Sequence, residues 1–177
     1  MKQQTISDFE YSLRKRKTRR EVFLDTMEEL IPWEEWVDAI RPNYPKGGRG
    51  RPPMHPEKML RMYLLQTWFH LSDAATEDAI YDSYCMRKFT GIDFLTETVP
   101  DRTTLRKFRH LLQRWGLAKA FSAALSRALK EAGYTLRRGS FTDASLSRTR
   151  SRSVASLSGR KARLGAPSDQ SSASSRH

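Results

Sequence analysis

Apolar residues recur every three or four positions along most of the first 133 residues, which is the spacing of amphipathic α-helices. Proline or glycine interrupts this pattern at intervals, at Pro32, Pro42, Gly116 and Gly133. The pattern predicts six or seven helices before Tyr134. The expected fold class is therefore mainly α.

Residues 41–56 hold so much proline and glycine that neither a helix nor a strand is expected to persist there. We expect this segment to link two helical units. After Gly133 the pattern changes, and apolar residues among β-branched ones predict a strand or hairpin over residues 134–146. Residues 147–177 contain no aromatic residue and are about one-third serine, so we expect this tail to be disordered. The expected units are a basic flexible arm (1–20), a helical domain (21–133), the strand segment and the tail.

Positive charge is concentrated outside the expected helical domain. The formal net charge is +12, and the run RKRKTRR at 14–20 and the serine-rich tail together account for it. An excess of this kind points to a polyanionic partner such as nucleic acid. No apolar run is long enough to span a membrane, and the lone Cys85 fits a reducing compartment, so we expect a cytoplasmic protein.

The helix expected after Asp101 carries two different stripes. Leu105, Phe108, Leu112 and Trp115 form an apolar stripe, and we expect them to face the core, as we do the tryptophans at 33, 36 and 68. Arginines, a lysine and a histidine occupy the other sides, and a shorter helix precedes the segment. This arrangement is typical of a helix-turn-helix recognition element. The spacing alone also fits the solvated face of an ordinary bundle helix, and it leaves both interpretations open.

Three segments supply the candidate DNA contacts. An arm of clustered cations adds phosphate contacts without reading sequence, whereas the helix after Asp101 brings side chains to base edges. The predicted DNA-binding residues are Arg14, Lys15, Arg16 and Lys17 in the arm, Arg49 and Arg51 in the linker, and Arg102, Thr103, Arg106, Lys107 and Arg109 in the helix.

Three phrases, GRGRPPMHPEKMLRMYLLQTWFHLSD, PDRTTL and RRGSFTDASL, resemble the N-terminal half of a bacterial insertion-sequence transposase of the DDE class. The resemblance implies a helical DNA-binding region followed by a ribonuclease-H-like catalytic domain. It places Asp143 at the first catalytic carboxylate of that family. Leu71 to Asp73 and Pro100 to Leu105 match two further family motifs.

The resemblance also implies the chemistry. DNA cleavage and strand transfer use two divalent metals, Mg²⁺ in the full-length family enzyme, held by three acidic groups. Asp143 would be a metal ligand only if a domain outside this chain completed the site, so we expect no tightly bound metal and no activity from the chain alone. The abrupt change of composition near Leu146 suggests a frameshift, either decay or a programmed shift.

The expected function is that of a truncated insertion-sequence transposase that binds double-stranded DNA at terminal inverted repeats. A DNA-binding regulator of transposition, pairing with itself or with full-length transposase, is the first alternative. A remnant without function is the second. The expected location is the bacterial cytoplasm, at the nucleoid when DNA is bound.

Overall fold

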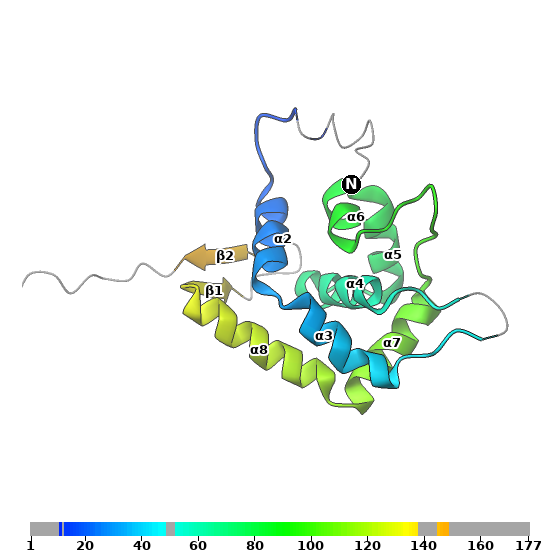
Figure 1. Ribbon diagram of the computed structural model, residues 1–177. Helices are drawn as coiled ribbons and strands as arrows, with labels where there is room; N and C mark the ends of the chain where they lie inside the picture. Colours follow the sequence, from blue (N-terminus) through cyan, green and yellow to red (C-terminus); the bar gives the residue numbers. More distant parts are fainter. Residues whose placement is uncertain (1–10, 12, 49–51, 138–144, 149–177) are drawn as a thin grey trace, which may run out of the picture.

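The computed structural model describes residues 11, 13–48, 52–137 and 145–148. Its main elements are helices, so the prediction of a mainly α fold is confirmed (Figure 1). The helices are α2 (Arg19–Leu30), α3 (Trp33–Ile40), α4 (Pro56–Phe69), α5 (Asp73–Asp82), α6 (Tyr84–Thr90), α7 (Arg102–Arg114) and α8 (Leu117–Glu131), with a short 3₁₀ turn η1 (Arg41–Asn43) after α3.

Local capping residues explain where several helices begin. The Thr18 side chain accepts a hydrogen bond from the Glu21 backbone N–H, and the Glu21 carboxylate accepts one from the Thr18 N–H in return. This reciprocal pair starts α2 at Arg19, two residues before the predicted start of the helical domain at residue 21. At the start of α5 the Ser72 side chain accepts a hydrogen bond from the Ala75 backbone N–H, without a reciprocal bond.

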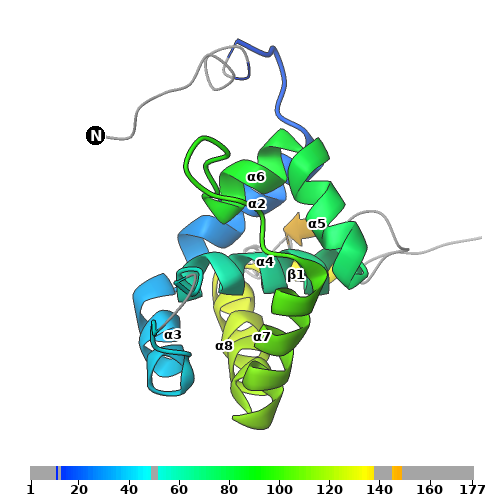
Figure 2. The same cartoon turned by 90° about the vertical axis from the view of Figure 1, so that its right-hand side faces the viewer.

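Helix α4 lies at the centre of the fold and contacts α3, α5, α6 and α7 (Figure 2). The sequence predicted a single apolar stripe on this helix, but its burial extends around most of its circumference. Arg61 and Gln66 are buried together with the apolar residues Met59, Leu60, Met62, Leu64, Leu65 and Phe69. Thr67 is the exposed position in this part of the helix.

Aromatic contacts join the outer helices to this centre. Trp36 of α3 stacks on Phe121 of α8, with ring centroids 4.5 Å apart and planes 9° from parallel. Phe23 of α2 meets the rings of Trp68 and Phe69 edge to face. Helices α7 and α8 are joined only by Trp115 and Gly116, and α8 runs back along α3 and α2. One core thus connects all of these elements.

Two short strands follow α8. Strand β1 (Tyr134–Arg137) pairs antiparallel with β2 (Ser145–Arg148), with Leu136 opposite Leu146. Strand β1 and the first two residues of β2 lie in the segment 134–146, for which we predicted a strand or hairpin. Strand β2 continues through Ser147 and Arg148, so the prediction that the disordered tail begins at residue 147 is wrong for these two residues, because they pair with Thr135 and Tyr134 of β1. Asp143 and the predicted tail beyond Arg148 lie outside the described residues.

Candidate nucleic-acid interface

The start of α7 is built by the segment PDRTTL. Asp101 is the N-cap, and one of its carboxylate oxygens accepts the Thr104 backbone N–H at 2.7 Å. Hydrogen bonds from the side chain and backbone of Thr104 lower the pKa of Asp101 below its usual value. Leu105, one residue further on, is the first core residue of the helix. The cap therefore sets where the basic face of α7 begins.

One side of α7 packs on the rest of the protein. Leu105, Phe108 and Leu112 are buried, as predicted, and the Phe108 ring meets Tyr44 and Tyr63 edge to face. The prediction that Trp115 continues this stripe into the core is wrong, because 53% of Trp115 is exposed. The helix ends at Arg114, and Gly116 adopts a left-handed conformation (φ 68°), so the chain turns toward α8 before the stripe completes another turn.

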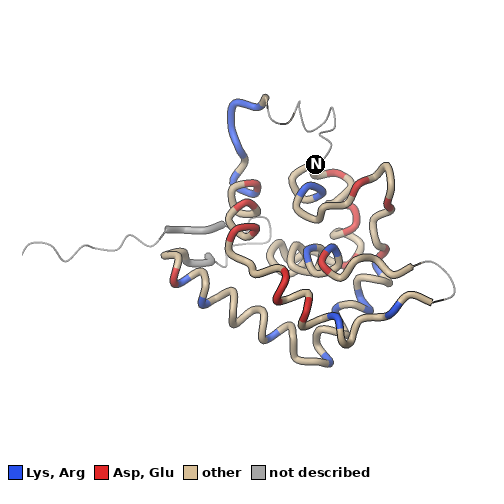
Figure 3. Tube along the Cα trace, viewed as in Figure 1, with Lys and Arg blue, Asp and Glu red and all other residues tan. Residues whose placement is uncertain are grey.

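The opposite side of α7 is basic. The helix contains no acidic residue, and its exposed polar residues are Arg102, Thr103, Thr104, Arg106, Lys107, His110, Gln113 and Arg114. Within the described part of the chain, none of the four cations in that set forms an ion pair. Figure 3 shows Lys and Arg positions along α7, whereas α3 and α5 carry acidic positions. An external anion would meet these cations without displacing a described internal partner.

Arg109 differs from the other cations of α7. Its guanidinium donates to both carboxylate oxygens of Asp73 on α5, at 2.6 and 3.1 Å, and to the Gln66 side-chain oxygen on α4 at 3.2 Å. The Gln66 amide nitrogen in turn donates to Asp73 at 2.6 Å. This network ties α7 to α4 and α5. Arg109, which we predicted to contact DNA, therefore lies at the inner edge of the basic face and already holds an internal carboxylate.

The network also changes the acidity of Asp73. Partial burial alone would raise its pKa, but hydrogen bonds from Gln66 and Arg109 and the positive charges of Arg109 and Arg106 outweigh that effect. The pKa of Asp73 is consequently lowered, and the carboxylate is held in its charged form.

The connection before α7 is longer than the turn of a helix-turn-helix. Residues 91–101 separate α6 from α7, whereas that motif joins its helices through three or four residues. Gly91 ends α6 in a left-handed conformation (φ 67°), and the next N-cap is Asp101, directly after Pro100. Helix α7 packs instead against α5 and α4. The shorter helix that we predicted before α7 exists, but the turn between the two is not a tight one.

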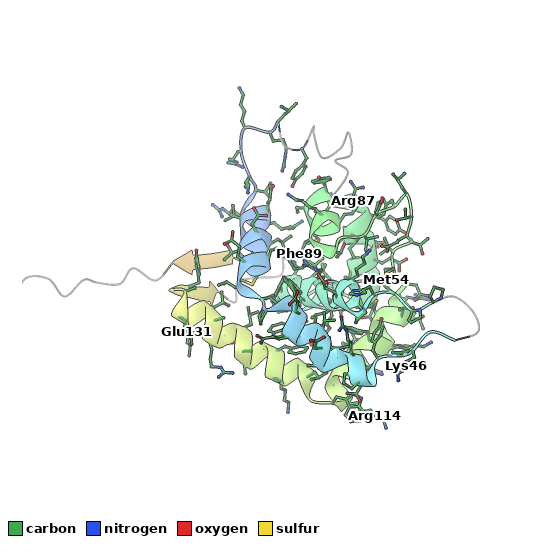
Figure 4. The ribbon with its side chains drawn as sticks, viewed as in Figure 1. Lys46, Met54, Arg87, Phe89, Arg114 and Glu131 are labelled. Atoms are coloured by element: carbon green, nitrogen blue, oxygen red, sulfur yellow. The ribbon has the colours of Figure 1, made fainter. Side chains whose placement is uncertain are left out.

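The two ends of the linker that we predicted over residues 41–56 are attached to each other and to the core beside α7. The Tyr44 hydroxyl donates to the backbone carbonyl of Met54 at 2.6 Å, and burial raises the pKa of this hydroxyl to about 12. Because the Tyr44 ring also contacts Phe108, the base of the loop is fixed against α7. Lys46 is exposed and lies at the same lower end of the molecule as Arg114 (Figure 4). Arg49 and Arg51 lie outside the described residues.

Two of the four predicted arm cations have internal partners. Arg14 lies over the Tyr11 ring and donates to Glu21 at 2.9 Å, and Lys17 pairs with Asp25 at 2.6 Å. Lys15 and Arg16 are exposed. The residues before α2 are thus partly attached to that helix.

Comparison with known protein families identifies this group of helices. The family model described as Transposase domain (DUF772) matches residues 11–111, which is more than half of the chain. The chain belongs to this transposase-domain family. No solved structure matches the chain. The matched region of the transposase domain contains α2 to α6 and most of α7, including the Asp73 and Arg109 pair.

Sequence reasoning missed two features of this transposase-domain interface. It did not find the partner of Arg109, although a signal was present, because Arg109 lies four residues after Leu105 and three before Leu112 and so beside the apolar stripe. It also omitted Arg114 and His110 from the predicted contacts, although both share the outward side of α7 with Thr103 and Lys107. Among the helices described, none is both long and apolar enough to cross a membrane.

Proposed function

We propose that this transposase-domain protein binds double-stranded DNA through the outward face of α7. The observation that carries the proposal is the charge of that helix, which has five cations and no acid, with only Arg109 in a described ion pair. Exposed cations without internal partners gain the most from phosphate groups, because no existing ion pair has to be broken. The family match supports a role in transposition, a process that acts on DNA.

The geometry of α7 suits the major groove, which admits one α-helix. Thirteen residues make a helix of roughly 20 Å, and its N-terminal turn is exposed at Arg102 and Thr103. In this arrangement Arg102, Thr103 and Arg106 reach base edges, and Lys107 and Arg114 contact phosphates. The Asp73 and Arg109 pair fixes the angle of α7 to the rest of the protein, and so the direction from which these side chains approach DNA.

We further propose that the DNA is the terminal inverted repeat of an insertion sequence and that the transposase is of the DDE class. The three sequence phrases and the transposase-domain match support this. In such an enzyme Asp143 would supply one of three carboxylates for two Mg²⁺ ions, which activate the attacking hydroxyl and stabilise the leaving oxygen. Asp143 lies outside the described residues, so the function proposed from the structure is DNA binding.

The test measures binding of the full chain to labelled duplex DNA by fluorescence anisotropy over a series of salt concentrations. One duplex carries the repeats found beside the gene, and the other has an arbitrary sequence. Arg106→Ala is expected to cost roughly 1 to 3 kcal/mol of binding free energy and to relax sequence preference. Lys107→Ala is expected to weaken binding to both duplexes and to reduce the salt slope by about one unit.

A matched control removes the same number of charges elsewhere. Lys119, Arg127 and Lys130 are exposed on α8, and replacement of all three by alanine, which removes as many charges as the α7 triple variant, is expected to leave the affinity for the repeat nearly unchanged. The triple variant Arg102→Ala, Arg106→Ala, Lys107→Ala decides the matter. If it folds normally and binds the repeat as tightly as the parent at equal salt, α7 is a solvated bundle face and the proposal is wrong.

A further inference from the structure

A second basic site lies at the other end of the protein. A pocket of about 680 Å³ opens between residues 11–20 and the turn that joins α5 to α6. Among its lining residues are five cations and one carboxylate, namely Arg14, Arg16, Lys17, Arg19, Arg20 and Asp82. An opening with this excess of positive charge favours an anionic ligand.

Two of the five cations, Arg16 and Arg19, are available to such a ligand. Arg14 and Lys17 are paired with carboxylates of α2, but Arg16 and Arg19 are exposed and have no ion-pair partner among the described residues. The Nε of Arg20 is buried and makes no hydrogen bond within the described part of the chain, while its guanidinium lies over the Phe69 ring, 5.3 Å from its centre. The pocket therefore retains unsatisfied donors and positive charge.

Contacts on both sides give this pocket a defined shape. On one side the buried Glu21 carboxylate accepts hydrogen bonds from the Tyr11 hydroxyl, the Arg14 guanidinium and the Thr18 N–H. On the other side the Tyr11 ring rests on the Tyr84 ring of α6, with centroids 3.8 Å apart. The backbone that carries Arg16 is thus attached on one side to α2 and, through Tyr11, to α6 on the other, which lowers the entropy cost of binding an anion.

The pocket lies at the opposite end of the molecule from the C-terminal end of α7. In both Figure 1 and Figure 2 the segment before α2 is at the top, and the turn between α7 and α8 is at the bottom. Acidic positions of α2 and α5 lie between them (Figure 3). The exposed carboxylates of these two helices include Glu28, Glu29 and Asp78. A single straight duplex that touched both basic sites would run over these like charges, at an electrostatic cost.

We propose that the pocket before α2 holds backbone phosphates of a second DNA segment, so that one chain contacts two separate duplexes at once. This proposal rests on the proposed function for the first segment, which α7 binds. Arginine contacts to phosphates position a duplex without reading its sequence, so the second segment is DNA of any sequence. The two sites therefore differ in what they recognise as well as in where they lie.

The experiment is a bridging assay with the full-length chain. A duplex carrying the terminal repeat is fixed to beads and saturated with protein, and capture of a labelled free duplex of arbitrary sequence is measured. The pocket variant is Arg16→Ala with Arg19→Ala, which spares Arg20 and the buried Glu21. Loss of two phosphate contacts is expected to lower capture of the free duplex roughly ten- to thirtyfold at physiological salt, while retention on the beads changes little.

The matched control is Lys119→Ala with Arg127→Ala, which removes the same charge from α8 and is expected to bridge as the parent does. Two outcomes overturn the proposal. If the pocket variant captures the free duplex as well as the parent, bridging comes from another site or from a second copy of the chain. If the pocket variant loses the bead-bound duplex as strongly as the free one, both sites hold the same segment.

Failure of the proposed function gives a different result. In that case the α7 triple variant would stay on the beads as the parent does, whatever the pocket variant shows. If α7 is the first site, the triple variant loses most of its affinity for the bead-bound repeat and binds the repeat and the arbitrary duplex equally weakly, through the pocket alone. Circular dichroism of each variant confirms that the helices are retained before binding is compared.

Discussion

Helices α4 and α7 both carry arginine among apolar residues, but the arginine of α4 is buried in the fold, whereas the arginines on the outward face of α7 are exposed. Arg61 of α4 is 9% exposed and donates hydrogen bonds to Glu28, Glu57 and the backbone carbonyl of Phe89. The cations on the outward face of α7 are exposed and, among the described residues, without an acidic partner. One helix lies inside the bundle and the other at its edge.

The difference between Arg61 and the cations of α7 shows how basic residues that stabilise the fold can be distinguished from those that are available to bind a ligand. Burial alone would lower the pKa of Arg61, but hydrogen bonds and charge from Glu28 and Glu57 outweigh it and raise the pKa. A cation inside the fold is therefore accompanied by carboxylates from the protein itself. A cation at the edge, if no internal acid reaches it, remains available to an external anion. The neighbours of a basic residue locate an interface better than the number of basic residues does.

The largest expected effect tests the inner side of α7. Phe108→Ala is expected to lower the free energy of unfolding by roughly 3 to 5 kcal/mol, because a buried ring between Tyr44 and Tyr63 is replaced by a cavity. Urea unfolding followed by circular dichroism measures this. Leu95→Ala is the control, because that side chain is 85% exposed and should have almost no effect. A loss below about 1 kcal/mol would mean that α7 is not anchored as described.

The second largest expected effect is the difference in stability loss between substitution of the buried Arg61 and of the exposed Arg106. Arg61→Met is expected to cost about 2 to 3 kcal/mol of stability, because hydrogen bonds to charged groups are lost and the Phe89 carbonyl loses its donor. Arg106→Met, on the outward face of α7, is expected to change stability by less than about 0.5 kcal/mol. The same unfolding experiment serves for both variants. Equal effects at the two positions would remove the distinction between the helices.

A smaller effect, with a defined pH dependence, is expected at the junction between α5 and α7. Asp73→Asn removes the charge that Arg109 holds and is expected to cost about 1 to 2 kcal/mol near neutral pH. Because the folded pKa of Asp73 lies below its usual 3.8, the pair contributes fully above that value and is lost as the pH falls through the lowered pKa.

The check on Asp73 is a comparison of parent and variant unfolding over an acidic pH series. The stability difference should shrink as the pH falls, since protonation of the parent imitates the substitution. Arg109→Ala completes a double-mutant cycle with Asp73→Asn and should show a coupling between the two side chains. A stability difference that is constant down to the acid limit would contradict the proposed role of the carboxylate charge.

The smallest expected effect concerns the end of α7. Trp115→Ala is expected to change stability by less than about 1 kcal/mol, because more than half of the side chain is exposed. Trp36→Ala is the matched comparison and should cost roughly 3 to 5 kcal/mol, because its buried ring stacks on Phe121. Thermal unfolding of the two variants separates them. Similar losses would restore the sequence-based prediction that both tryptophans are in the core.

Local features of α7 could be predicted from the sequence alone. The N-cap at Asp101, the helix end before Gly116 and the buried stripe of Leu105, Phe108 and Leu112 were all predicted and are all present. Each depends on residues within about one or two helical turns, because capping and amphipathic spacing are short-range effects. The mainly α fold follows from the same short-range pattern repeated along the chain.

The exposed cations of the candidate site were only partly predictable. Arg102, Thr103, Arg106 and Lys107 are exposed on α7, in keeping with their spacing away from the apolar stripe. The same periodicity could not show that Arg109, on the inner edge, is held by Asp73. That carboxylate lies 36 positions earlier in the chain.

The sequence by itself therefore determined which segments become helices and which side of α7 is apolar. Only the tertiary structure decided that α4 is enclosed on most sides, that Trp115 is exposed, and that a second basic site lies at the opposite end of the molecule from the C-terminal end of α7. Periodicity reports how residues are arranged around one helix axis, whereas burial and ion pairing depend on which other elements pack against that axis. Those neighbours come from distant parts of the chain and are brought together by the core as a whole.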